Sequence, residues 1–258
     1  MIGISVVVHT YNSEKYLERC LESVKSCQEI IVCDQHSTDR TVEIAYRYGS
    51  KVIYHKHIGF ADPARNFALS YASQEWVLVL DSDEEVPPEL LEHLRELAQT
   101  LPEDITSVLI PRKNLYLGEV LWITYPNYLL RFFKNGAVEF SEKVHAPPII
   151  KKGKAYQIKK NRKKLSIIHH NYEAIESWIK KMNVYTNLEQ EKYREKGIKF
   201  SAGLLFSSSI GEFVKKYVFK GGFKQGWYGF VFSSLFAVYK FIAAVKLWEV
   251  EFKERKNK

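Results

Sequence analysis

Residues 76–85 read Trp76-Val-Leu-Val-Leu-Asp81-Ser82-Asp83-Glu84-Glu85, so five apolar residues run directly into an acidic cluster. A short, uninterrupted apolar run is typical of a strand buried on both faces of a parallel sheet. Open α/β sheets bind ligands just beyond the carboxyl ends of such strands. In an extended segment Asp81 and Asp83 lie on one face, where they suit Mg²⁺ or Mn²⁺ with substrate phosphate oxygens completing the shell. The alternative is an acidic, solvated loop.

The segments before this run alternate strands with helices. We expect strands at residues 4–9, 29–34, 51–54 and 76–80, and helices around residues 16–24, 41–48, 62–73 and 87–99. Such alternation at these lengths predicts βαβ units and a parallel sheet.

Beyond Leu101 the predicted strands are shorter, at residues 107–112, 129–134, 137–140 and 165–169, and a long helix follows at residues 173–196. Asn135-Gly136 is a strong turn signal and predicts a hairpin between the second and third of these strands.

The C-terminal part is rich in Phe, Tyr, Leu and Val at residues 200–219 and 227–248. Lys240 interrupts the apolar run, so we expect no transmembrane helix, which needs about 18 apolar residues. Two alternatives stay open: the helices pack as ordinary core, or they lie in a membrane interface with aromatic side chains down and lysines outward. The lysines among the aromatic residues favour the interface; they are Lys215, Lys216, Lys220, Lys224, Lys240 and Lys246.

The 258 residues carry a net charge of +8 and a pI near 9.1, which indicates an anionic partner such as nucleic acid, an acidic membrane or a phosphorylated substrate. No nucleic-acid-binding module is recognisable. The basic residues of Lys151–Lys164 form either a solvated loop or a contact for acceptor phosphates or anionic lipid. The 3 cysteines lack CxxC spacing and are expected to be reduced thiols in a cytosolic protein. The first residues do not have the pattern of a signal peptide.

Four motifs in order and spacing resemble the family 2 glycosyltransferases of the GT-A fold. They are Val6-Val-Val-His-Thr-Tyr-Asn12, Asp34 with Ser37-Thr38-Asp39, Ala64-Arg65-Asn66-Phe-Ala68, and Leu80-Asp81-Ser82-Asp83-Glu84. The later Arg131-Phe-Phe-Lys134-Asn-Gly136 and Val144-His145 resemble the bacterial lipopolysaccharide-core glucosyltransferases within that family.

The resemblance implies an α/β fold of GT-A type, with a Rossmann-like mixed sheet, helices on both faces and a helical C-terminal extension. We expect a catalytic domain at residues 1–196, with a nucleotide-sugar half at 1–100 and an acceptor half at 101–196. Residues 197–258 are expected to form an amphipathic, membrane-associating extension.

The resemblance also assigns roles in nucleotide-sugar binding. Thr10, Tyr11 and Asn12 form the first strand-to-helix turn, which offers backbone donors to the nucleotide, and Tyr11 can stack on the base. The alternative for Tyr11 is a helix staple. Asp34 is expected to accept the uracil imide N–H, unless it only caps a turn.

Three further residues are expected near the diphosphate. Arg65 is expected to face the diphosphate or donor sugar, or else to be a solvated helix arginine. Ser82 belongs to the motif in which Asp81 and Asp83 hold the divalent ion. Asp39 either contacts the ligand or caps the next helix.

The remaining catalytic groups are less well specified. His145, His169 and His170 are candidates for a third metal ligand, and each can equally be a structural histidine. The subgroup has a Glu directly after its Val-His pair, where this chain has Ala146. The nearest substitute as general base is Glu142, followed by Glu139, and a surface carboxylate is the alternative for both.

These inferences predict an inverting, metal-dependent enzyme that moves glucose from UDP-glucose to a membrane glycolipid such as a lipopolysaccharide inner core. It would lie peripherally on the cytoplasmic face of the inner membrane. Alternatives are a polyprenyl phosphate acceptor, or a non-catalytic membrane- or carbohydrate-binding protein.

Overall fold

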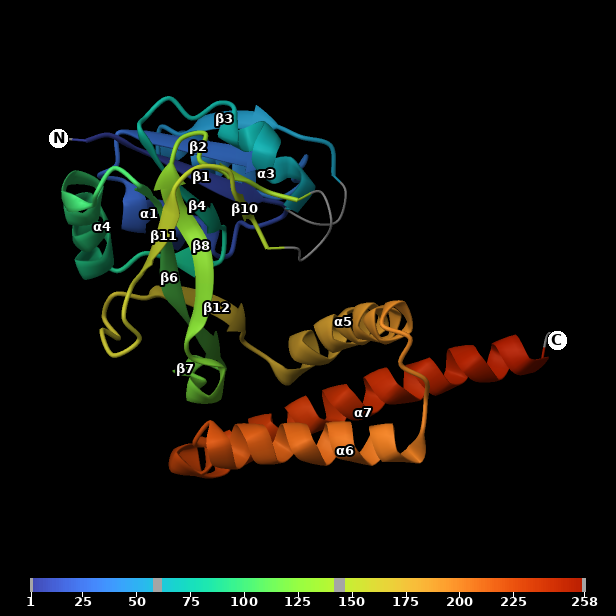
Figure 1. The fold of residues 1–258 in the computed structure, drawn as a ribbon. Coiled ribbons are helices and arrows are strands. Elements are labelled where there is room, and N and C mark those ends of the chain that lie inside the picture. The colour runs from blue at the N-terminus through green and yellow to red at the C-terminus, as the bar shows by residue number, and fades with distance from the viewer. Residues whose placement is uncertain (1, 58–61, 142–146, 257–258) are drawn as a thin grey trace. The chain divides into compact units, whose positions relative to one another are not determined.

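A computed structural model describes residues 2–57, 62–141 and 147–256 of the chain (Figure 1). The chain divides into two compact units. The first unit comprises Met1–Lys113 and Pro126–Asn171, and the second comprises Asn114–Tyr125 and Tyr172–Lys258.

The first unit is built on a mixed sheet with the strand order β3-β2-β1-β4-β8-β6-β12-β5. Its parallel part consists of β3 (Lys51–Tyr54), β2 (Glu29–Asp34), β1 (Ile4–Thr10) and β4 (Trp76–Asp81). Beyond β4 lie β8 (Asn127–Lys134), β6 (Ile105–Tyr116), β12 (Ile167–Tyr172) and β5 (Glu84–Glu85), and β11 (Lys154–Gln157) and β7 (Glu119–Val120) also pair with β6. The predicted parallel strands are therefore all present, with β1 buried along its whole length.

Helices cover both faces of this sheet because alternate side chains of each central strand point to opposite sides. Val6 and Leu78 join one apolar cluster with α1 (Leu17–Val24), α2 (Thr41–Arg47) and α4 (Pro88–Thr100). Val7 and Val79 join a second cluster with α3 (Asp62–Leu69).

The predicted hairpin at Asn135-Gly136 is wrong: the turn is present, but the two strands that flank it do not pair with each other. The turn forms, with the Ala137 N–H donating to the Lys134 carbonyl at 2.9 Å. Both edges of β8 are already paired, to β4 and to β6. The following strand β9 (Val138–Glu139) therefore pairs with β10 (Ile149–Ile150) in a separate two-stranded sheet.

The second unit is mainly helical. It contains α5 (Ile175–Glu195), α6 (Ala202–Val214), a π-helical turn (Lys215–Phe219), a 3-10 turn (Gly222–Gln225) and α7 (Gly226–Lys256). The helices α6 and α7 run side by side (Figure 1). A core of Tyr116, Leu121, Trp178 and Phe232 joins α5 to α7. This packing groups α5 with the C-terminal helices, whereas the sequence suggested a boundary after residue 196.

One helical segment in the described part of the chain, Gly222–Lys256, is long and apolar enough to cross a membrane. We expected Lys240 to exclude such a segment. That expectation is wrong, because the length and composition of the segment are sufficient despite Lys240. A single charge does not lower the hydropathy of an 18-residue window enough to disqualify it.

Candidate active site

Three parallel strands bring the predicted residues to one edge of the sheet. In the strand register, Thr10 at the end of β1 lies opposite Asp34 at the end of β2. On the other side, His9 lies opposite Asp81 at the end of β4. The carboxyl ends of β1, β2 and β4 thus form one edge, where open α/β sheets bind ligands.

Asp34 is fully buried and organises the two turns beside it. Its carboxylate accepts hydrogen bonds from the Thr10 hydroxyl at 2.9 Å, from the Ser37 N–H at 2.8 Å and from the Ser37 hydroxyl. A carboxylate has about four acceptor positions, so Asp34 keeps capacity for a further donor. Its role in recognising a base stays a prediction.

Asn12 joins the first turn to the second. Its N–H donates to the Ser37 hydroxyl at 2.8 Å, and its side-chain oxygen accepts from the Thr38 N–H at 2.8 Å. Its φ of 46° lies in the left-handed region, which asparagine tolerates better than most residues. Asp39 accepts from the Thr41 N–H at 3.0 Å and from the Glu14 N–H at 3.0 Å, so it joins the start of α2 to the first turn.

Tyr11 presents an aromatic surface at this edge. Its ring stacks on the His57 ring with centroids 3.8 Å apart and an interplanar angle of 22°, and the side chain is exposed. The imidazole of His57 in turn contacts the Gln35 side-chain oxygen at 3.1 Å. The exposed ring remains available to a planar ligand group.

Asp81 is held by two arginines. Arg65 donates to Oδ1 at 2.9 Å, and Arg131 forms a short ion pair with Oδ2. Burial alone would raise the pKa of the Asp81 carboxyl, but Arg131, Arg65 and Arg112 outweigh it and hold that pKa well below its usual range. Arg65 is thus a buried partner of Asp81, not the solvated helix arginine that was the alternative.

A second carboxylate, Glu84, extends this network. Its side chain has no exposed surface and pairs with Arg112 at 2.7 Å and with Arg131 at 3.2 Å. Arg112 was not among the site residues predicted from the sequence. The sequence does contain a signal for it, because Arg112 is a lone arginine at the end of a predicted apolar strand and a charge buried in a strand needs a partner.

His9 lies inside the same cluster. Burial, followed by the neighbouring Arg65, lowers the pKa of His9 to about 3. The imidazole is therefore neutral at physiological pH, as expected for a side chain next to buried guanidinium groups.

Asp83 points to a different partner from that of Asp81. Its Oδ2 lies 3.3 Å from Nε2 of His169. This approach follows from the pairing of β5 with β12, in which His169 lies opposite Glu84 and the His170 N–H donates to the Asp83 carbonyl at 2.9 Å. Of the two histidine candidates that the structure describes, His169 and His170, it is His169 whose side chain approaches Asp83.

His170 faces away from that pair. Its Nε2 lies 3.0 Å from a Glu85 carboxylate oxygen, and its Nδ1 lies 3.0 Å from the Arg19 guanidinium. Ser82 donates from its hydroxyl to the Ser13 hydroxyl at 2.8 Å, which ties the acidic turn to the first turn. Glu142, His145 and Ala146 lie outside the described residues.

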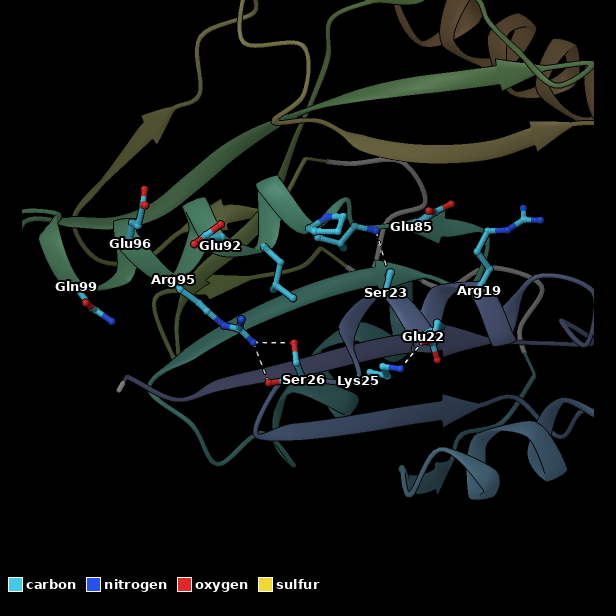
Figure 2. Close-up of a pocket in the computed structure, with 13 residues that line it drawn as sticks. Arg19, Glu22, Ser23, Lys25, Ser26, Glu85, Glu92, Arg95, Glu96 and Gln99 are labelled. Atoms are coloured by element: carbon cyan, nitrogen blue, oxygen red, sulfur yellow. Dashed lines mark hydrogen bonds and ion pairs between the residues drawn. The ribbon is translucent and has the colours of Figure 1, made fainter.

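A cavity of about 750 Å³ lies between α1 and α4, and Figure 2 shows its lining side chains. Arg95 donates to the Ser26 carbonyl at 2.8 Å, and Lys25 pairs with Glu22. Arg95 is thus bonded to Ser26, and Lys25 and Glu22 pair with each other, on the face of the sheet that α1 and α4 cover. Two of the residues that line the cavity, Arg19 and Glu85, contact His170.

The donors at the sheet edge suit a divalent ion that is shared with a substrate. Among the residues that the structure describes, no group of three or more His, Cys, Asp or Glu side chains is arranged around one metal position. Asp83 and His169 form a carboxylate–imidazole pair, which fits Mn²⁺ and leaves most positions to phosphate and water. Both Asp81 oxygens already accept from arginines, so Asp83 is better placed to ligate than Asp81.

Comparison with known proteins adds to this geometry. The profile described as "Glycosyl transferase family 2" matches residues 5–171. An uncharacterised glycosyltransferase of Rickettsia typhi is 29% identical, with 99% of this chain and 90% of that protein covered. The lipopolysaccharide core biosynthesis glycosyltransferase LpsC of Rhizobium meliloti is 28% identical, with 96% and 93% covered. The solved structure of S. aureus TarS 1–349 aligns over 100% of this chain and 92% of its own, with a TM-score of 0.51 and 17% identity.

Proposed function

The chain belongs to glycosyl transferase family 2, and we propose that it transfers a sugar, glucose from UDP-glucose, to a membrane glycolipid. The expected GT-A-like fold is confirmed by the mixed sheet and by its similarity to TarS. The acceptor class is supported by the name of the Rhizobium meliloti relative, which acts in lipopolysaccharide core biosynthesis.

The observation that carries this proposal is the approach of His169 to Asp83 at 3.3 Å. The pair lies beside the turns at Asn12 and Ser37, which are fixed to each other by hydrogen bonds. A nucleotide diphosphate at this edge meets backbone donors from one side and a carboxylate–imidazole pair from the other.

We assign the donor site as follows. Tyr11 stacks on the base, and Asp34 and the Thr10–Asn12 turn hold the nucleoside. Asp83 and His169 would hold Mg²⁺ or Mn²⁺, which when bound would supply Lewis-acid stabilisation of the diphosphate leaving group. Ser82 fixes the acidic turn against Ser13. Arg65 and Arg131 fix the Asp81 carboxylate and supply positive charge beneath the diphosphate.

The transfer inverts the anomeric centre in a single displacement. The acceptor hydroxyl oxygen bonds to the anomeric carbon while the bond from that carbon to the UDP oxygen breaks. A general base takes the hydroxyl proton. We assign this role to Glu142, with His145 following three residues later in the sequence. The rival Glu139 pairs with Lys151.

A turnover assay with two acceptors tests the proposal. UDP-glucose and Mn²⁺ are supplied with truncated lipopolysaccharide core lipid in one arm and with extracted polyprenyl phosphate in the other. We expect glucosylated core lipid in the first arm. Product in the second arm alone would show that the acceptor is polyprenyl phosphate. Absence of product with every nucleotide sugar would refute the proposed reaction.

We further propose that the enzyme works peripherally on the cytoplasmic face of the membrane that holds its acceptor. The apolar character of the C-terminal helix supports this location.

A further inference from the structure

The helix α7 exposes a continuous apolar line along one side. Its members recur every three to seven residues, the spacing of one face of a helix; they are Trp227, Val231, Val238, Phe241, Trp248 and Phe252, all exposed. The neighbouring α6 and its π-helical turn expose a similar line, consisting of Phe206, Ile210, Val214 and Val218. We call these two lines together the outer face. Soluble monomers rarely leave an apolar surface of this extent uncovered.

The charges in the middle of α7 lie on its opposite side. Between Gly226 and Trp248 the helix carries two charged residues, Lys240 and Lys246. Lys240 pairs with Glu189 of α5, and Lys246 donates to the Asn183 carbonyl at 2.8 Å and the Asn187 side chain at 2.6 Å. The lysines that were expected to point outward here instead fasten α7 to α5, and the outer face is left without them.

The turn between α6 and α7 combines the most exposed aromatic side chains with positive charge. Phe219 and Trp227 are each 81% exposed. Lys220 and Lys224 lie near them in sequence, whereas Lys215 and Lys216 pair with Glu212. No acidic residue occurs between Glu212 and Glu249. Residues 197–258 contain ten Lys and one Arg against four Glu, so this segment holds a net +7 of the chain's +8.

We propose that the outer face of α6 and α7 lies in the plane of an anionic membrane interface, with the α6–α7 turn as its deepest point. The apolar side chains of the two lines contact acyl chains, and the turn lysines Lys220 and Lys224 contact lipid phosphates. This inference rests on the proposed function, because a glycolipid acceptor resides in a membrane and the enzyme has to reach it there.

An orientation across the bilayer fits the contacts of α7 less well. The helix is fastened along its length to α5, and α5 carries eight charged residues between Ile175 and Glu195. A spanning α7 would bring these charges into the hydrocarbon, where unpaired charges are strongly disfavoured. A helix with one apolar face and a charged partner on the other lies in the interface instead.

Vesicle flotation of the full chain tests the surface. We compare vesicles of phosphatidylethanolamine and phosphatidylglycerol with vesicles of phosphatidylcholine alone. We expect binding to the anionic vesicles that weakens with salt. The double change Lys220→Glu with Lys224→Glu should weaken binding about thirtyfold or more, and Phe219→Ser with Trp227→Ser should weaken it about tenfold or more.

Two matched control variants test whether vesicle binding depends on the α6–α7 turn in particular. Lys152→Glu with Lys159→Glu reverses the same charge in the other basic segment, and Tyr46→Ser removes an exposed aromatic residue from α2. Both controls should bind vesicles like the unchanged chain. Equal losses in test and control variants would overturn the proposal, as would a lipid-free dimer that the Phe219→Ser with Trp227→Ser variant no longer forms.

A measurement of depth in the bilayer distinguishes an α7 that lies in the membrane interface from an α7 that spans the membrane. Phe241→Trp, made together with Trp227→Phe and Trp248→Phe, places the tryptophan of the outer face midway along α7. A helix in the interface should be quenched most by lipids brominated near the headgroup, and a spanning helix by lipids brominated near the acyl ends. The second result would contradict the in-plane orientation.

Calorimetric titration of UDP-glucose into each variant separates this inference from the proposed function. The surface variants should bind donor like the unchanged chain. Donor binding without vesicle binding would reject the surface alone. Vesicle binding without any nucleotide-sugar binding would reject the proposed function alone.

Discussion

His169 reaches to within 3.3 Å of Asp83 because a two-residue strand, β5, pairs with β12. The acidic turn after β4 supplies the carboxylate, and a strand near the end of the first unit supplies the imidazole. The site is therefore assembled by long-range strand pairing, and changes on either strand affect the same carboxylate–imidazole pair.

The buried arginines should contribute strongly to stability. Arg131→Met leaves Asp81 and Glu84 without one guanidinium and should lower the free energy of unfolding by about 3–5 kcal/mol. Urea denaturation followed by circular dichroism measures the change. Arg47→Met, on the exposed side of α2, should stay within about 0.5 kcal/mol. Equal stabilities for the two variants would refute the role given to the network.

His9 should make the protein less stable in acid. Its folded pKa of about 3 lies below the usual value of 6.5. Between these values the unfolded chain binds a proton that the folded chain does not, so stability falls as pH falls. The slope from this residue is about 1.4 kcal/mol per pH unit.

Denaturation at a series of pH values from 6.5 to 4.5 checks this slope. The His9→Asn variant should lose that part of the pH dependence, and His36→Asn, at an exposed position, should keep it. An unchanged slope in His9→Asn would show that His9 does not titrate in this way.

Tyr11 should contribute to nucleotide affinity through its ring. Tyr11→Ala should weaken UDP binding about tenfold, the usual effect of losing one base–aromatic stack. Tyr11→Phe should retain the affinity because the ring remains. If the alanine variant binds UDP normally in calorimetry, Tyr11 is a structural residue of the turn, held by His57.

Glu142 should act on turnover alone. Glu142→Gln should lower turnover at least about a hundredfold while leaving UDP-glucose affinity unchanged, because a general base acts on the acceptor. Glu139→Gln is the matched control and should remain active. The reverse result, with Glu139→Gln inactive and Glu142→Gln active, would transfer the role to Glu139.

The parallel strands and helices of the first hundred residues could be predicted because their signals are local. Apolar runs such as 76–80 and the helical spacing of Leu17, Cys20 and Leu21 predict the elements that the structure contains. Asn135-Gly136 predicts a turn correctly, but a turn signal does not report which strand edges are already occupied.

The site was predictable only in part for the same reason. The acidic pair and the two turns are marked by local motifs. The choice of His169 depends on β5, whose two glutamates do not resemble a strand in sequence. The pairing of Arg112 with Glu84 joins distant segments, and the outward or inward direction of Lys240 depends on the position of α5.

The central claim is that Asp83 and His169 hold a divalent ion against the diphosphate of UDP-glucose. Calorimetric titration of UDP-glucose with and without Mn²⁺ tests it most directly, on the unchanged chain, Asp83→Ala, His169→Gln and the surface control Asp104→Ala. We predict Mn²⁺-dependent binding in the unchanged chain and the control, and a loss of at least about tenfold in each site variant. Metal-dependent binding that persists at full strength in both site variants would contradict the account.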